Sequence, residues 1–244
     1  MTTTANNPAI LLIPGHWLGA WAWDDVVEHL ETEYSRVIPV TLPGLEADDP
    51  ARAAKTVEDQ AAAILETVNR HAPGQPVVIA AHSGANFPVS LFLDRNPERV
   101  KRVVWVDSGP VAPGSVFAPG LPDDLKELPL PPFEVLAGQA SLEGLSADAL
   151  GRFRAGAVPE PGPVLRQRVE LTNNARRSIP TTLVCCSIPG AQVLELARTG
   201  HPVFAETANL EDMEVIDLPT GHWPMWSRPR DLAEAIGSAA SRAG

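Results

Sequence analysis

The chain has 244 residues, a formal net charge of −11, and 44% hydrophobic against 20% charged residues. This composition is typical of one soluble globular domain, or of one domain that carries a large insertion. No basic tract interrupts the acidic balance, so we expect neither nucleic acid nor an anionic membrane as a partner, because both require clustered Lys and Arg.

The first 15 residues have no basic stretch and only a five-residue apolar run. We therefore expect neither a signal peptide nor a membrane helix there. The two cysteines, Cys185 and Cys186, are adjacent, which rules out a disulfide framework. These features favour a cytoplasmic protein, with a monomer or a homodimer as the open alternatives for its assembly.

Short apolar runs recur along the chain with helical segments between them. They are apolar throughout instead of alternating, which is typical of strands covered on both faces. The expected strands are residues 9–13, 37–40, 77–81, 103–106, 182–186 and 214–218.

Helical patterns separate these runs. Thr56 begins one helix, with Asp59 three residues later as in a capping box and an apolar stripe through Ile64 and Val68. A last helix is expected to start near residues 227–229. Strands that alternate with helices predict an α/β fold with a mostly parallel, doubly covered sheet.

Residues 108–178 break this alternation, because they are rich in proline. We expect helices only at 147–155 and around 164–171. An excursion of this length between two core strands is typical of an inserted cap over a ligand site. The expected division is therefore a core of residues 1–107 and 179–244, with a cap of residues 108–178.

A serine lies at the apex of a strand–turn–helix segment. The run VVIAA leads directly into His82, Ser83 and Gly84, and a helical pattern follows. Such a turn pushes the hydroxyl out of the sheet and points the next backbone N–H at a developing oxyanion. The flanking residues are Ala81 and Ala85 where glycines are usual, and a turn that merely links strand to helix is the alternative.

Two further loops carry residues that suit the same chemistry. After the first strand comes PGHWLGAWAW, in which the His16 N–H is placed to complete an oxyanion hole with that of Gly84. After the last strand comes LPTGHWPMW, in which His222 is placed to act as a general base. Each loop also has a structural alternative, a packed Trp-rich loop and a structural histidine.

Together these motifs resemble the α/β-hydrolase fold, and in particular its small branch of plant and bacterial esterases and hydroxynitrile lyases. PGHWLGAWAWDDV, AHSGA and GHWPMWSRP follow in the order of that branch and span the chain outside the cap. The resemblance implies Ser83 as nucleophile, His222 as base, and the His16 and Gly84 amides as the oxyanion hole.

The sequence departs from this branch in two places. Pro14 replaces the usual histidine before the loop glycine, and it would stiffen the loop by fixing φ instead. The segment after the penultimate strand, CCSIPG, lacks the usual acid. Asp107, one strand earlier, is the best substitute and keeps the order of serine, acid and histidine. Glu195, Asp217 or no acid at all are the alternatives.

The function that these residues predict is a serine hydrolase for an ester, thioester or lactone of a small apolar molecule. Trp17, Trp223, Met225, Phe117 and Phe133 would suit an apolar pocket wall. We expect no cofactor and no metal, because neither metal-ligand spacing nor a phosphate-binding glycine loop occurs. The other hypotheses are non-hydrolytic chemistry on the same fold (a lyase, C–C cleavage or cyclisation) and a non-catalytic binding protein.

Overall fold

The six expected strands form one parallel sheet. The computed structural model describes residues 7–242, and its sheet has the order β2–β1–β3–β4–β7–β8. The strands are β1 (Ile10–Ile13), β2 (Val37–Pro39), β3 (Val77–His82), β4 (Val100–Val106), β7 (Thr181–Cys185) and β8 (Met213–Asp217). The predicted α/β class is therefore confirmed.

The strand order brings together segments that are distant in sequence. β3 pairs with both β1 and β4, and β4 pairs in turn with β7. All of these pairs are parallel, so the loops that follow them emerge at the same edge of the sheet. His82 lies opposite Val106, and Val106 lies opposite Val184. The turns after β3, β4 and β7 are consequently neighbours.

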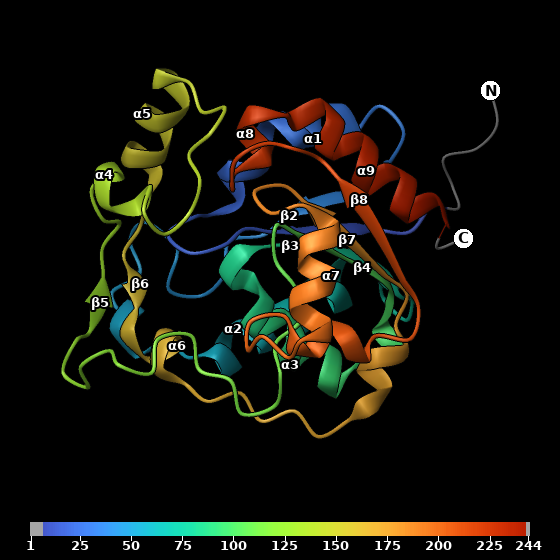
Figure 1. The fold of residues 1–244 in the computed structure, drawn as a ribbon, viewed down its shortest axis with the longest axis horizontal. Helices are drawn as coiled ribbons and strands as arrows, with labels where there is room; N and C mark the ends of the chain where they lie inside the picture. Colours follow the sequence, from blue (N-terminus) through green and yellow to red (C-terminus); the bar gives the residue numbers. More distant parts are fainter. Residues whose placement is uncertain (1–6, 243–244) are drawn as a thin grey trace.

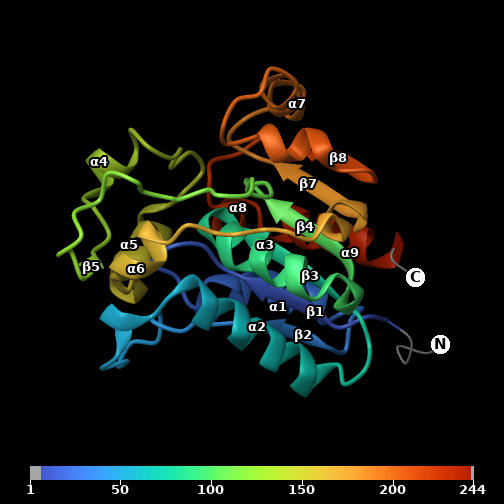
Figure 2. The ribbon, with the colours of Figure 1, turned by 90° about the horizontal axis from the view of Figure 1, so that it is seen from below.

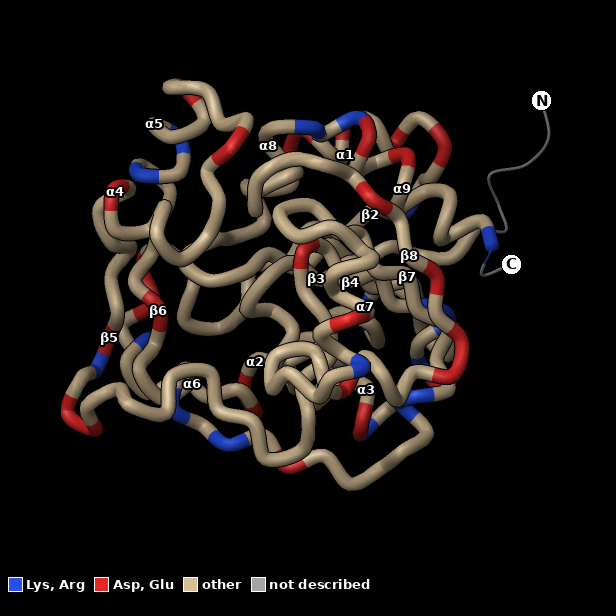
Figure 3. Tube along the Cα trace, in the orientation of Figure 1, with Lys and Arg blue, Asp and Glu red and all other residues tan. Residues whose placement is uncertain are grey.

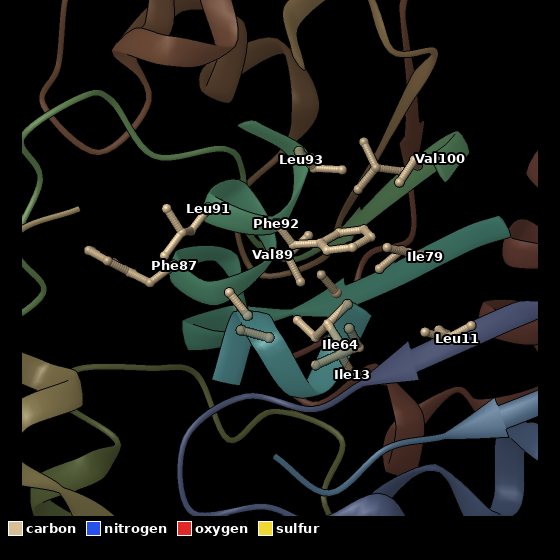
Figure 4. Close-up of a cluster of buried hydrophobic side chains, with 14 of the residues drawn as sticks. Leu11, Ile13, Ile64, Ile79, Phe87, Val89, Leu91, Phe92, Leu93 and Val100 are labelled. Atoms are coloured by element: carbon tan, nitrogen blue, oxygen red, sulfur yellow. The ribbon is translucent and has the colours of Figure 1, made fainter. Parts of the chain in front are cut away.

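Helices cover both faces of the sheet (Figures 1 and 2). One face carries α2 (Val57–His71), α3 (Asn86–Arg95) and α7 (Gly190–Arg198), and the other carries α1 (Asp24–Leu30), α8 (Pro224–Ser227) and α9 (Pro229–Arg242). Figure 4 shows part of the first layer, where Phe92 of α3 and Ile64 of α2 pack with Ile79 of β3. Burial of these apolar faces stabilises the sheet, and the sheet in turn positions the turns after β3, β4 and β7.

Helix α2 begins where the sequence predicts. Thr56 Oγ1 accepts the Asp59 N–H at 3.2 Å, and Asp59 Oδ2 accepts the Thr56 N–H at 2.9 Å. This reciprocal pair is a capping box, which satisfies two backbone donors that the first helical turn leaves free.

The segment 108–178 contains only short elements. These are β5 (Glu127–Leu128), α4 (Phe133–Leu136), α5 (Ala147–Gly156), β6 (Glu160–Pro161) and α6 (Gly162–Arg166), and they lie together beyond one end of the sheet (Figure 1). The helix expected at 164–171 is shorter, because Val169 pairs with Ser115 in an antiparallel bridge instead of continuing α6. The assignment of this segment as a cap, and the domain bounds themselves, stay predictions; residues 1–6 and 243–244 of those bounds lie outside the described range.

No helix within residues 7–242 has both the length and the apolar character needed to cross a membrane.

Candidate active site

Ser83 stands on a sharp turn between β3 and α3. Its φ is +51°, a left-handed conformation that a non-glycine residue rarely adopts. Gly84 follows it, and the flanking Ala81 and Ala85 are buried. Alanine is therefore small enough for both positions beside this elbow.

Ser83, His222 and Asp107 form a continuous chain of hydrogen bonds. His222 Nε2 lies 2.8 Å from Ser83 Oγ, and His222 Nδ1 lies 2.6 Å from Asp107 Oδ2. The serine follows β3, the carboxylate follows β4 and the histidine lies on the loop between β8 and α8. The structure thus brings together the three side chains that the sequence singled out.

Asp107 is held by the segment that lacks an acid of its own. Asp107 Oδ1 accepts the N–H groups of Cys186 and Ser187 at 3.0 and 2.8 Å, and the Ser187 hydroxyl donates to Oδ2 at 2.6 Å. Burial raises the pKa of Asp107, but the hydrogen bonds from His222 and Ser187 outweigh it and lower the pKa to about 2. The carboxylate is therefore ionised at neutral pH.

The two alternative acids are engaged elsewhere. Asp217 Oδ1 accepts the Gly190 N–H at 2.6 Å, at the first residue of α7. Glu195 forms an exposed pair with Arg198 on the same helix. Neither is hydrogen-bonded to His222.

His82 connects two of the loops around Ser83. Its Nδ1 accepts the Gly15 N–H at 3.3 Å, and its Nε2 donates to the His222 carbonyl at 2.7 Å. Because an amide only donates and a carbonyl only accepts, these two contacts fix a neutral tautomer. Burial, followed by the nearby His222, lowers the pKa of His82 to about 3.

The loop after β1 lies against the serine turn. A Cβ added to Gly15 would come within 2.7 Å of Ser83 Cβ, so only glycine allows this approach. The His16 imidazole packs against Gly84, since a Cβ at Gly84 would overlap His16 Nε2. The two residues predicted to supply oxyanion amides are therefore in direct contact.

The loop that carries His222 is held by residues of segment 108–178. The His222 N–H donates to the Ser141 carbonyl at 2.8 Å, and the Gly221 N–H donates to the Glu143 carbonyl at 3.2 Å. Residue 221 must be glycine to pack against this segment. A Cβ there would come within 2.7 Å of Glu143 backbone atoms.

A pocket of about 550 Å³ opens over Ser83, Asp107 and His222. Of the predicted wall residues, Trp17, Phe117 and Trp223 line it, together with Ile188, Val193 and Phe204. Met225 and Phe133 do not. Met225 is fully buried in the layer of α1, α8 and α9, and Phe133 packs against Phe153, so both serve the apolar core.

Sequence reasoning missed three residues of this site: His82 as a link between loops, Ser187 as a partner of Asp107, and Glu160. Glu160 Oε2 accepts the Trp17 N–H at 3.1 Å from within segment 108–178. The order CCS beside a relocated acid was the available signal for Ser187, whereas nothing in the sequence pattern relates Glu160 to Trp17.

Within residues 7–242, no group of three or more His, Cys, Asp or Glu side chains is arranged to hold a metal ion.

Comparisons with known sequences identify the family. The model of the alpha/beta hydrolase family matches residues 10–235. The chain is 25% identical to the probable hydrolase R7 of a Phoma species over 96% of this chain and 98% of that protein. It is also 31% identical to the probable esterase PIR7A of rice (Oryza sativa subsp. japonica), over 38% of this chain and 35% of that protein.

Solved structures share the fold at low identity. An extracellular alpha/beta-hydrolase from a Paenibacillus species has a TM-score of 0.72 and 20% identity, covering 95% of this chain and 98% of that one. Tomato methylketone synthase I has a TM-score of 0.75 and 14% identity, covering 98% and 99%. Since the family model spans most of the chain and the relatives are named hydrolases and esterases, the protein is an enzyme that belongs to the alpha/beta hydrolase family.

Proposed function

We propose that this α/β-hydrolase is a serine hydrolase that cleaves an ester, thioester or lactone of a small apolar molecule. The observation that carries the proposal is the unbroken chain from Asp107 through His222 to Ser83, with contacts of 2.6 and 2.8 Å. Such a chain activates a serine hydroxyl, which is a weak nucleophile by itself.

The reaction follows in two halves. His222 Nε2 takes the hydroxyl proton as Ser83 Oγ bonds to the substrate carbonyl carbon, and the carbonyl π electrons move onto oxygen. The N–H groups of His16 and Gly84 stabilise that oxyanion. When the intermediate collapses, the alcohol leaves with the proton from His222. Water then attacks the acyl-enzyme by the same route, releasing the acid and restoring Ser83.

Asp107 supports the charge that appears on His222. The carboxylate is ionised, because the pKa of Asp107 is lowered to about 2 by the His222 and Ser187 hydrogen bonds against the effect of burial. It accepts a hydrogen bond from the Nδ1 N–H of His222, which leaves Nε2 free to take the serine proton, and it stabilises the imidazolium that results.

The pocket supports an uncharged, largely apolar substrate. Aromatic and aliphatic side chains supply most of its wall, and none of the described residues that line it is Lys or Arg. A substrate carboxylate would therefore enter without a cationic partner, which is unfavourable. The volume of about 550 Å³ is in the range of small-molecule sites.

Two other hypotheses start from the same sequence. The case for a non-catalytic binding protein rested on the missing acid after the penultimate strand, and Asp107 supplies a carboxylate at hydrogen-bond distance from His222. Non-hydrolytic chemistry would use the same residues and is distinguished by its products. The hydroxynitrile-lyase version is disfavoured, because Trp223 follows His222 where those enzymes have lysine.

Hydrolysis of p-nitrophenyl butyrate by the wild type, Ser83→Ala and Ser108→Ala tests the proposal. Ser108 is a matched control, because it also lines the pocket but donates to the Ala81 carbonyl instead of facing His222. We expect Ser83→Ala to lower kcat by at least about 10³-fold and Ser108→Ala to stay within several-fold of the wild type. Wild-type turnover by Ser83→Ala would contradict the proposal.

A further inference from the structure

Glu160 is a buried carboxylate for which the proposed reaction has no role. It lies on β6 in segment 108–178, and its side chain is 2% exposed. A buried carboxylate is unfavourable unless hydrogen bonds or opposite charge compensate it. Its described partners are both on the loop after β1, which carries one of the two amides proposed for the oxyanion hole.

The first partner is the backbone of Trp17. The Trp17 N–H donates to Glu160 Oε2 at 3.1 Å. Trp17 has a φ of +66°, which is unfavourable for a bulky aromatic residue and persists only where surrounding contacts enforce it. The Trp17 N–H belongs to the peptide bond between His16 and Trp17, so the hydrogen bond to Glu160 fixes the orientation of that peptide.

Segment 108–178 holds Trp17 at two more points. The Trp17 indole N–H donates to the Leu128 carbonyl at 3.0 Å, and the Trp17 carbonyl accepts the Val158 N–H at 2.9 Å. Leu128 of β5 lies opposite Glu160 of β6 in the two-stranded sheet. The two-stranded sheet and the neighbouring Val158 therefore hold one residue of the loop after β1.

The second partner is the side chain of His16. His16 Nδ1 lies 3.2 Å from Glu160 Oε2, and both side chains are buried. The other edge of the His16 ring rests on Gly84, at a position that a side chain on residue 84 would fill. Phe117 closes the arrangement with its ring centroid 4.3 Å from that of His16.

We propose that Glu160 is a positioning residue for the oxyanion hole, and this inference rests on the proposed serine hydrolase function. One carboxylate oxygen holds the Trp17 amide and the His16 ring at once. Through the Trp17 amide it orients the loop that presents the His16 N–H, and through the His16 ring it sets the distance from that loop to Gly84. The relative placement of the two amides thus depends on one residue of segment 108–178.

This role predicts a specific kinetic signature. The amides act on the oxyanion, which forms in the transition state, so their misplacement lowers kcat and leaves KM nearly unchanged. We expect Glu160→Ala to lower kcat for p-nitrophenyl butyrate by about 10²-fold, with KM within about 3-fold of the wild type. Glu160→Gln keeps an acceptor oxygen at this position, so it should recover most of that loss.

Glu127→Ala is the matched control. Glu127 is on β5, in the same two-stranded sheet, but its carboxylate faces Arg52 at 3.8 Å instead of the oxyanion loop. We expect this variant to keep kcat near the wild-type value. A loss equal to that of Glu160→Ala would overturn the proposal, because it would show general damage to the segment.

Glu160→Asp covers the case in which Glu160→Ala does not fold. Aspartate is a carboxylate too, but its side chain is one methylene shorter, so its oxygens lie farther from the Trp17 N–H and the His16 ring. We expect about a 10-fold loss of kcat with KM unchanged. Wild-type kcat in Glu160→Asp and in a folded Glu160→Ala would overturn the proposal. A wild type that hydrolyses no ester would instead be a failure of the proposed function, which separates the two.

Discussion

Backbone strain is concentrated at single residues of the site. Within residues 7–242, three non-glycine residues have positive φ: Trp17, Ser83 and Asp107. They belong to the loop after β1, the turn after β3 and the turn after β4. Such conformations cost on the order of 1 kcal/mol or more each and persist where neighbouring contacts over-determine them. The hydrogen bonds to Glu160, His222 and Ser187 supply those contacts.

His82 has a consequence for stability in acid. The unfolded chain binds a proton at this histidine near its ordinary pKa of 6.5, whereas burial lowers the pKa in the folded protein to about 3. Between these values the unfolded state carries the additional proton, so the free energy of unfolding falls as the pH falls from about 6.5 to about 3.

We therefore predict that His82→Gln has a flatter pH dependence of stability than the wild type. Glutamine does not titrate, and its amide can still accept from Gly15 and donate to the His222 carbonyl. Urea unfolding over this pH range gives both slopes, which should differ by up to about 1.4 kcal/mol per pH unit. Equal slopes would contradict the prediction, because they would mean that His82 binds a proton equally well in the folded and the unfolded protein.

Strand pairing explains how Asp107 comes to lie beside the segment that follows β7. β4 lies beside β7, so a carboxylate after β4 reaches the amides of Cys186 and Ser187 after β7. Those amides and the Ser187 hydroxyl stabilise the negative charge of the Asp107 carboxylate. The segment after β7 has no acidic residue of its own. Asp107 therefore lies at the same edge of the sheet as the residues that follow β7.

The capping box of α2 gives a test of element stability away from the site. Thr56→Ala removes the acceptor for the Asp59 N–H, and we predict a loss of about 1 kcal/mol in the free energy of unfolding without change in activity. Thr67→Ala on the same helix is the control. The Thr67 hydroxyl bonds to the Ala63 carbonyl within the helix, so its removal should cost little. Equal losses in urea unfolding would refute a specific capping effect.

Across the whole molecule, the sequence was sufficient to predict those features that depend on residues close together in the chain. The apolar runs, the capping box and the serine turn were all predictable, because strand burial and turn geometry follow from neighbouring residues. Figure 3 shows Lys and Arg dispersed among Asp and Glu along the described chain, as the sequence indicated.

What could not be predicted depends on packing between distant segments. Glu160 reaches Trp17 across 143 positions, through a proline-rich segment whose path no periodicity specifies. Met225 and Phe133 were misplaced because an apolar residue beside a site can face either the pocket or the core. Asp107 was the best substitute for the missing acid, but Asp217 stayed open as an alternative, because their difference lies in strand order.

Labelling by a fluorophosphonate, followed by measurement of the intact mass, tests the proposed activation of Ser83 directly. We predict one label on the wild type and none on Ser83→Ala. Asp107→Asn should label slowly, because asparagine tolerates the left-handed backbone but does not support the imidazolium. Asp217→Asn, which alters only the contact to Gly190, should label at the wild-type rate. A folded wild type that takes up no label, or a Ser83→Ala variant that does, would contradict the proposal that Ser83 is the activated nucleophile.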